Sequence, residues 1–213
     1  LVPARSGRLR LSLNPDRVCA ALYSAIPASI RIVDAVNPVT LFKAVKNESQ
    51  IRCLKNAMKK DGAALVRFLI WLEDALRDAA LPVTERTVQE RLKEFRAEQP
   101  DFVGESFTTI AGFNQHGAIV HYAVTDETDI PISGNGLLLI DSGAHYLDGT
   151  TDITRVVICG EAGKEQIRDY TLVLKGHIAL ASAVFPEGTR GYQLDAFARL
   201  PLWREGLSYG HGT

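Results

Sequence analysis

Apolar residues recur at helical spacing through the middle of the chain. Asn47, with Gln50 three residues later, resembles a capping box and predicts a helix start. Spacings of three, four and seven then predict one buried face of a long helix. That face comprises Ile51, Leu54, Met58, Leu65, Phe68, Leu69, Leu72 and Leu76. Further helices are expected over residues 84–98, 164–184 and 193–205, and the Lys and Glu residues of 85–98 are interpreted as a solvated helix face.

Runs rich in β-branched and aromatic residues predict strands between these helices. The expected strands cover residues 107–110, 119–122, 137–140 and 152–158. Helices on one face of a mainly antiparallel sheet would form an α+β layer. The chain divides near residues 38–46. A helix over 14–25 and a strand over 30–33 precede that division, and they are typical of the closing part of an α/β domain.

Two aspartates eleven residues apart carry the candidate chemistry. Asp141 closes the apolar run 136–140, and Asp152 precedes the β-rich run 153–158. A hairpin turning at 146–149 would bring the two carboxylates together, where they either share a proton or bind a divalent metal. The alternative is structural. Asp141 would end a strand, Asp148 would form a turn, and Asp152 would pair with Arg155, and the spacing alone leaves both interpretations open.

Composition narrows the class of protein only slightly. The chain has 213 residues, 46% hydrophobic content and a net charge of −1, which is typical of a soluble globular protein. It has neither the basic excess of a nucleic-acid-binding protein nor an apolar run of membrane-spanning length. Its three cysteines are odd in number and far apart, which favours reduced, buried thiols in a cytoplasmic protein.

Several segments resemble one known family, in the same order and at similar distances. Residues 140–143 and 148–155 resemble the first metal-ligand segment of Xaa-Pro aminopeptidases (aminopeptidase P). These are pita-bread metallopeptidases, which also include prolidase, methionine aminopeptidase and creatinase. Residues 116–122, 176–181, 186–189 and 194–207 resemble further family segments, and 209–213 match the opening of a Gly-His-Gly-Thr-Gly-His-Gly-Val-Gly motif. The resemblance runs from about Pro38 to the last residue, and Asp-Gly-Thr-Thr-Asp at 148–152 favours the aminopeptidase branch.

This resemblance implies a metal-dependent aminopeptidase that releases the N-terminal residue from peptides with proline in the second position. Asp141 and Asp152 would be metal ligands for two divalent ions, with Mn²⁺ favoured and Zn²⁺ or Co²⁺ as alternatives. His121 and His211 would be catalytic and contact the substrate, and Phe107 would form an apolar wall of the substrate pocket. The implied partners are proline-containing peptides, without nucleic acid or membrane, and the implied state is a cytoplasmic homodimer when intact.

The chain also departs from the family pattern. The second histidine of the motif is the metal ligand in the family, and the chain ends at Thr213, two residues before it. Two glutamate ligands normally follow further on. We therefore expect an inactive internal fragment, with residues 1–40 as the remnant of a creatinase-type N-terminal domain and 41–213 as the first part of the pita-bread domain.

Other functions remain open, and the remaining polar side chains have structural interpretations. The alternatives are a prolidase- or creatinase-like hydrolase and a non-catalytic pita-bread protein that binds peptides. His116 and His145 are expected in loops or at the surface, and His177 is expected to pack or cap within its helix. Arg155 is expected to form an ion pair with the carboxylate cluster.

Overall fold

The computed structural model describes residues 2–3, 9–77 and 82–212. The chain forms two compact units that meet at Cys53 and Leu54, inside the long helix α3 (Glu48–Arg77). The predicted domain boundary near residue 40 stays a prediction.

The first unit is a small sheet with short helices. β2 (Leu9–Leu13) pairs antiparallel with β1 (Val2–Pro3) and parallel with β3 (Arg31–Asp34). Its helices are η1 (Pro15–Arg17), α1 (Ala20–Ser24) and α2 (Pro38–Ala44). Among residues 9–53, no side chain is buried.

One prediction for this unit was wrong, and one helix was not predicted. The single helix expected over 14–25 is broken, because Val18 and Cys19 are extended between η1 and α1. Helix α2 was missed, although Asn37 accepts a hydrogen bond from the backbone N–H of Val39 and Pro38 begins the helix, both standard start signals.

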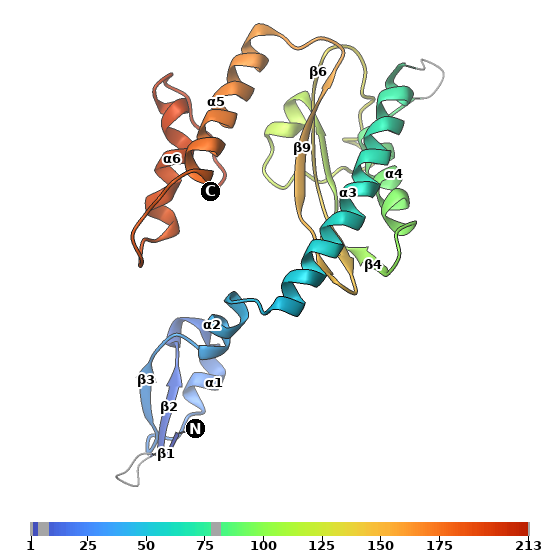
Figure 1. The fold of residues 1–213 in the computed structure, drawn as a ribbon. Coiled ribbons are helices and arrows are strands. Elements are labelled where there is room, and N and C mark those ends of the chain that lie inside the picture. The colour runs from blue at the N-terminus through green and yellow to red at the C-terminus, as the bar shows by residue number, and fades with distance from the viewer. Residues whose placement is uncertain (1, 4–8, 78–81, 213) are drawn as a thin grey trace. The chain divides into compact units, whose positions relative to one another are not determined.

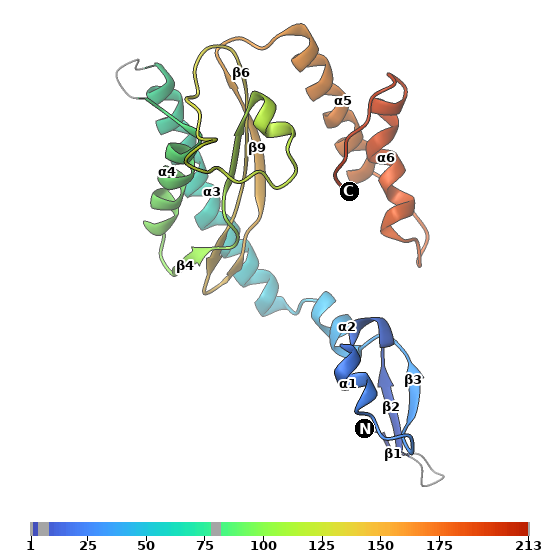
Figure 2. The same cartoon turned by 180° about the vertical axis from the view of Figure 1, so that it is seen from behind.

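The second unit joins antiparallel strands to amphipathic helices. Helix α4 (Glu85–Ala97) follows α3, and both views show the two helices side by side along the sheet (Figure 1 and Figure 2). One sheet has the order β5-β6-β9, with β5 (Ile110–Phe113), β6 (Gly136–Ser142) and β9 (Ile153–Cys159). The other has the order β4-β7-β8, with β4 (Phe102–Glu105), β7 (Ala144–Tyr146) and β8 (Gly149–Thr150). All these pairs are antiparallel, as predicted.

The core of this unit lies between α3, α4 and the sheet β5-β6-β9. Its largest fully buried apolar side chains are Phe68, Leu72, Val88, Leu92, Leu138 and Ile140. Each such side chain stabilises the fold by roughly 1.5–3 kcal/mol relative to an exposed one. The stripe predicted for α3 is confirmed from Leu65 to Leu76, whereas Ile51 and Met58 of the same stripe are exposed, so its first part was wrong.

Two of the expected strands are not present. Residues 106 and 107 form a bend between β4 and β5, and the strand begins only at Ile110. The segment expected as a strand over 119–122 is a turn that follows the 3₁₀ helix η2 (Asn114–Ala118). A Cβ at Gly112 would lie 2.7 Å from the backbone N of Gly117, so only glycine lets η2 approach β5 this closely.

The last two helices pack against each other. α5 (Lys164–Ala181) and α6 (Gly191–Trp203) form a helical pair, close to the predicted ranges. In the part of the chain described, no helix is long and apolar enough to cross a membrane. All three cysteines are free thiols, but the expected burial holds only for Cys159, since Cys19 is exposed.

Candidate functional site

The two candidate carboxylates lie where β6 and β9 pair. Asp141 is the Cα partner of Thr154 across this antiparallel ladder, and the Thr154 hydroxyl donates a 2.8 Å hydrogen bond to Asp141 Oδ1. Asp152 is two residues before Thr154 and is exposed. Asp152 directly precedes β9, whose first residue Ile153 pairs with Ser142, so the ladder brings the backbone of Asp152 near the end of β6 that carries Asp141.

A close backbone contact holds the hairpin between the two aspartates. The backbone N–H of Thr151 donates to the carbonyl of Ala144 at 2.8 Å, and the Ser106 hydroxyl donates to the carbonyl of Thr151 at 3.0 Å. A Cβ at Gly143 would lie 2.1 Å from that Thr151 carbonyl oxygen. Only glycine therefore lets the chain return so close to the end of β6.

Helix α3 holds the turn of this hairpin at Asp148 through an ion pair with Lys60. Asp148 accepts hydrogen bonds from Lys60 and, at 2.6 Å, from the Asn56 side-chain amide. The hydrogen bond from Lys60 holds the pKa of Asp148 below its usual range, and Asn56 adds to that shift. Lys60 also donates to Asp101 at 2.6 Å, and the hydrogen bonds to these two carboxylates raise the pKa of Lys60. Asp148 is thus both a turn residue and an ion-pair partner.

A buried ion pair lies beside this anchor. Arg96 donates two hydrogen bonds to the Asp61 carboxylate, at 2.8 and 3.1 Å, and both side chains are fully buried. The Tyr146 hydroxyl of β7 donates to the same carboxylate at 3.1 Å. Burial, followed by the nearby Asp61 charge, raises the pKa of Tyr146. Glu85 is fully buried, so the interpretation of the Lys and Glu residues of 85–98 as a solvated helix face was wrong at the first residue of α4.

The structure brings the two predicted histidines together. The imidazoles of His121 and His211 meet edge to face, with 5.5 Å between ring centroids. Both side chains are exposed, and His121 has a left-handed backbone with φ 55°. Arg199 of α6 holds the segment of His211, because it donates to the backbone carbonyls of Tyr209 at 2.7 Å and His211 at 2.6 Å.

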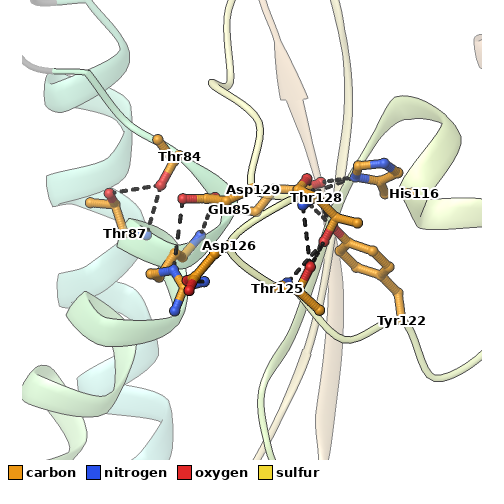
Figure 3. A network of polar contacts seen from close by, with 10 residues as sticks. Thr84, Glu85, Thr87, His116, Tyr122, Thr125, Asp126, Thr128 and Asp129 are labelled. Carbon is orange, nitrogen blue, oxygen red and sulfur yellow. Dashed lines mark hydrogen bonds and ion pairs between the residues drawn. The ribbon is translucent and has the colours of Figure 1, made fainter.

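The loop of His121 is tied to the start of α4 by a network that sequence reasoning missed (Figure 3). Glu85 accepts from the Tyr122 hydroxyl at 2.8 Å and from the backbone N–H of Phe113 at 2.7 Å. His116 Nδ1 lies 3.0 Å from both Glu85 oxygens, and its ring stacks on Tyr122. His116 is therefore largely buried rather than a surface residue, because η2 directs it inward.

The other residues considered in the sequence are Phe107, Arg155, His145 and His177. Phe107 is half-buried in the bend between β4 and β5. Arg155 donates to the backbone carbonyl of Thr154, and within the described residues no ion pair joins it to Asp141 or Asp152, so the expected pairing was wrong. His145 is exposed as predicted, whereas His177 is exposed mid-helix and does not pack or cap.

The donor set suits a hard divalent cation. Carboxylate oxygens are the ligands that Mn²⁺ prefers, and the bond from Thr154 engages one of the two Asp141 oxygens. Across residues 2–3, 9–77 and 82–212, no group of three or more His, Cys, Asp or Glu side chains is placed to hold a metal. Asp141 and Asp152 as metal ligands therefore stay a prediction.

Residues 52–213 match the model of metallopeptidase family M24. This match covers 162 of the 213 residues, counted from 52 to 213, so the chain belongs to metallopeptidase family M24. The expectation of an α+β pita-bread fold is confirmed by the solved structures that resemble it.

Individual relatives agree with the predicted branch of the family. The chain is 41% identical over 220 residues to aminopeptidase P1 of Lotus japonicus, covering 94% of the chain and 33% of that protein. It is 43% identical to Xaa-Pro aminopeptidase 1 of Dictyostelium discoideum, covering 92% of the chain and 31% of that protein. The chain thus spans about a third of the length of these relatives. The resemblance to aminopeptidase P is confirmed.

Solved structures show the same similarity. An X-prolyl aminopeptidase from Caenorhabditis elegans, described as a cytosolic enzyme with a di-nuclear active site, superposes with a TM-score of 0.88. The two sequences are 38% identical, and the superposition covers 98% of this chain and 34% of the C. elegans chain. A prolidase from Pyrococcus furiosus, at 20% identity and a TM-score of 0.69, shares the fold and covers 93% of this chain and 56% of its own.

Proposed function

We propose that the full-length protein containing this chain is a metal-dependent aminopeptidase that cleaves the bond before a proline in the second position. The observation that carries this proposal is the antiparallel pairing of β6, which contains Asp141, with β9, which begins directly after Asp152, within a family M24 chain. This pairing supports a close approach of the two carboxylates. The similarity to aminopeptidases P supports the choice of substrate. The cytosolic C. elegans relative supports a cytoplasmic location.

Asp141 and Asp152 would hold two divalent ions together with ligands from elsewhere in the full-length protein. The carboxylate donors favour Mn²⁺ over Zn²⁺ or Co²⁺. Bound there, the ions would supply the Lewis acidity for peptide hydrolysis. The Thr154 hydroxyl would orient the Asp141 carboxylate by its hydrogen bond.

The histidine pair would bind and orient the peptide. A bond to proline is a tertiary amide with no N–H, so recognition depends on its carbonyl and on the pyrrolidine ring. His121 and His211 offer imidazole N–H groups to the substrate and to the charge that develops on the carbonyl oxygen. Phe107, half-buried at the bend, would supply an apolar wall for the substrate.

Peptidase assays of the full-length protein test this proposal. We expect hydrolysis of Xaa-Pro-Xaa peptides with Mn²⁺, none of Xaa-Ala-Xaa peptides, and loss of activity with a chelator. Hydrolysis of Xaa-Pro dipeptides alone would indicate a prolidase instead, and activity that survives complete metal removal would refute the proposal.

The role of His121 has its own test. His121→Ala should lower kcat by ~10²-fold or more with unchanged metal content, because the imidazole would act on the transition state and not on the metal. His177→Ala, which removes an exposed histidine of α5, is the matched control and should leave kcat unchanged. Loss of bound metal in the first variant would make His121 a ligand.

A further inference from the structure

We propose that Glu85 and Tyr122 are positioning residues that fix His121 in the place from which it contacts the peptide substrate. This inference rests on the proposed function and extends it to two residues that need not touch the substrate. It starts from the network at the N-terminus of α4, where a buried carboxylate joins the loop of His121 to the helix (Figure 3).

Glu85 is the centre of this network. Its carboxylate is fully buried and faces three groups from the segment 113–122: the Phe113 backbone N–H, the His116 ring and the Tyr122 hydroxyl. A buried carboxylate needs such donors, because an unpaired one would be strongly disfavoured. Both ends of the loop are therefore fastened to one side chain.

The base of the network is itself held rigidly. Glu85 lies in the first turn of α4, where the Thr84 hydroxyl accepts from the backbone N–H of Thr87 and caps the helix. The Glu85 backbone N–H donates to the carbonyl of Ile130 at 3.2 Å, and the Arg86 backbone N–H donates to Asp129 at 3.1 Å. Glu85 therefore presents its carboxylate from a fixed point.

Tyr122 connects the Glu85 carboxylate to His121, the residue before it in the chain. Its side chain is 6% exposed, its hydroxyl donates to Glu85, with the Thr128 carbonyl as a second acceptor at 3.3 Å, and His116 stacks on its ring. His121 precedes it with φ 55°, a left-handed conformation that is uncommon for a residue with a Cβ. With Tyr122 directed into the protein, this backbone turns His121 outward, where its ring meets His211.

The conservative variant Tyr122→Phe tests the inference in the full-length protein. It keeps the ring and the stacking on His116 but removes the hydroxyl bond to Glu85. Because small displacements of a catalytic group strongly reduce the rate, we expect kcat to fall about tenfold with KM and metal content nearly unchanged. Tyr170→Phe, the same change at an exposed tyrosine of α5, is the control and should change neither value.

A double variant separates positioning from a general structural role. If Tyr122 acts through His121, Tyr122→Phe should change kcat less than about twofold once His121→Ala is present. An equal fall in both backgrounds, or an unchanged kcat in Tyr122→Phe alone, would overturn the inference while leaving the proposed function intact. A normal kcat in His121→Ala would overturn the proposed role of His121 and this inference with it, while metal-dependent peptidase activity would leave the rest of the proposed function standing.

A measurement without turnover provides a second readout. In protein labelled with ¹⁵N-histidine, Tyr122→Phe and Glu85→Gln should both shift the ring signals of His121, and Tyr170→Phe should not. Unmoved His121 signals in both network variants, with His116 signals shifted, would show that the network ends at His116 and would overturn the inference.

Discussion

The buried pair of Asp61 and Arg96 gives the sharpest prediction about stability. Arg96→Met removes the guanidinium that donates two hydrogen bonds to Asp61 and keeps an apolar side chain of similar length. Asp61 is then left fully buried, and among the described residues the Tyr146 hydroxyl at 3.1 Å is its remaining hydrogen-bond partner. We expect the second unit to be strongly destabilised, because one buried charge loses its counter-charge.

The magnitude follows from burial. Breaking a buried ion pair by removing one partner costs about 3–5 kcal/mol. Two features favour the lower end: Tyr146 still donates to Asp61, and Nη1 of Arg96 is buried without a hydrogen-bond partner among the described residues. A loss of about 3 kcal/mol is a large part of the ~5–15 kcal/mol that stabilises a typical protein.

Urea unfolding and amide hydrogen exchange in α3 and α4 measure this loss in the full-length protein. Arg77→Met is the matched control. Arg77 pairs with Glu73 one turn earlier on α3, and its side chain is 70% exposed, so its removal should cost only about 0.3–0.5 kcal/mol. The double variant Asp61→Leu with Arg96→Met should recover part of the loss, since no charge stays buried. Equal losses in the two single arginine variants would refute the reasoning.

Three further predictions concern the hairpin between the carboxylates. Gly143→Ala should destabilise the protein by roughly 1–3 kcal/mol and weaken Mn²⁺ binding in calorimetric titration, because its Cβ would meet the Thr151 carbonyl; unchanged binding would contradict this. Asp152→Asn should lower the Mn²⁺ content measured by elemental analysis, and full occupancy would exclude Asp152 as a ligand. Asp148 has a depressed pKa in the folded state, so its contribution is complete above its ordinary value of 3.8 and is lost as pH falls through the folded value. As the pH falls from above 3.8 through the folded value, Asp148→Asn should therefore lose less unfolding free energy than the unchanged protein, and equal losses would count against the pairing with Lys60.

Local patterns predicted the elements whose burial repeats along the chain. Apolar residues at helical spacing, Phe68 and Leu72 among them, predicted α3, and the apolar run that Asp141 closes predicted β6. Both predictions succeeded because the spacing of apolar residues reports the buried side of an element. Pairing of β6 with β9 was expected from the short connection between them. The carboxylate part of the candidate site was therefore accessible from the sequence.

The histidine loop and the buried charges were not accessible in this way. An alternating pattern over 119–122 suggests a strand, but the approach of Gly112 to Gly117 and the left-handed His121 produce a turn. Arg96 is typical of a solvated helix position, and its partner Asp61 is 35 residues earlier. Such pairs are fixed by tertiary packing, and no local periodicity reports them.

The hairpin between Asp141 and Asp152 also bears on the order in which the site assembles. These carboxylates are 11 positions apart, whereas His121 and His211 are 90 positions apart. The entropic cost of closing a loop grows with the logarithm of its length. Bringing the histidines together therefore costs about 2 kcal/mol more free energy than bringing the aspartates together. Hairpins form within ~1–10 μs, and distant contacts form more slowly. We therefore expect the hairpin that carries Asp141 and Asp152 to form early in folding, before the histidine pair has formed.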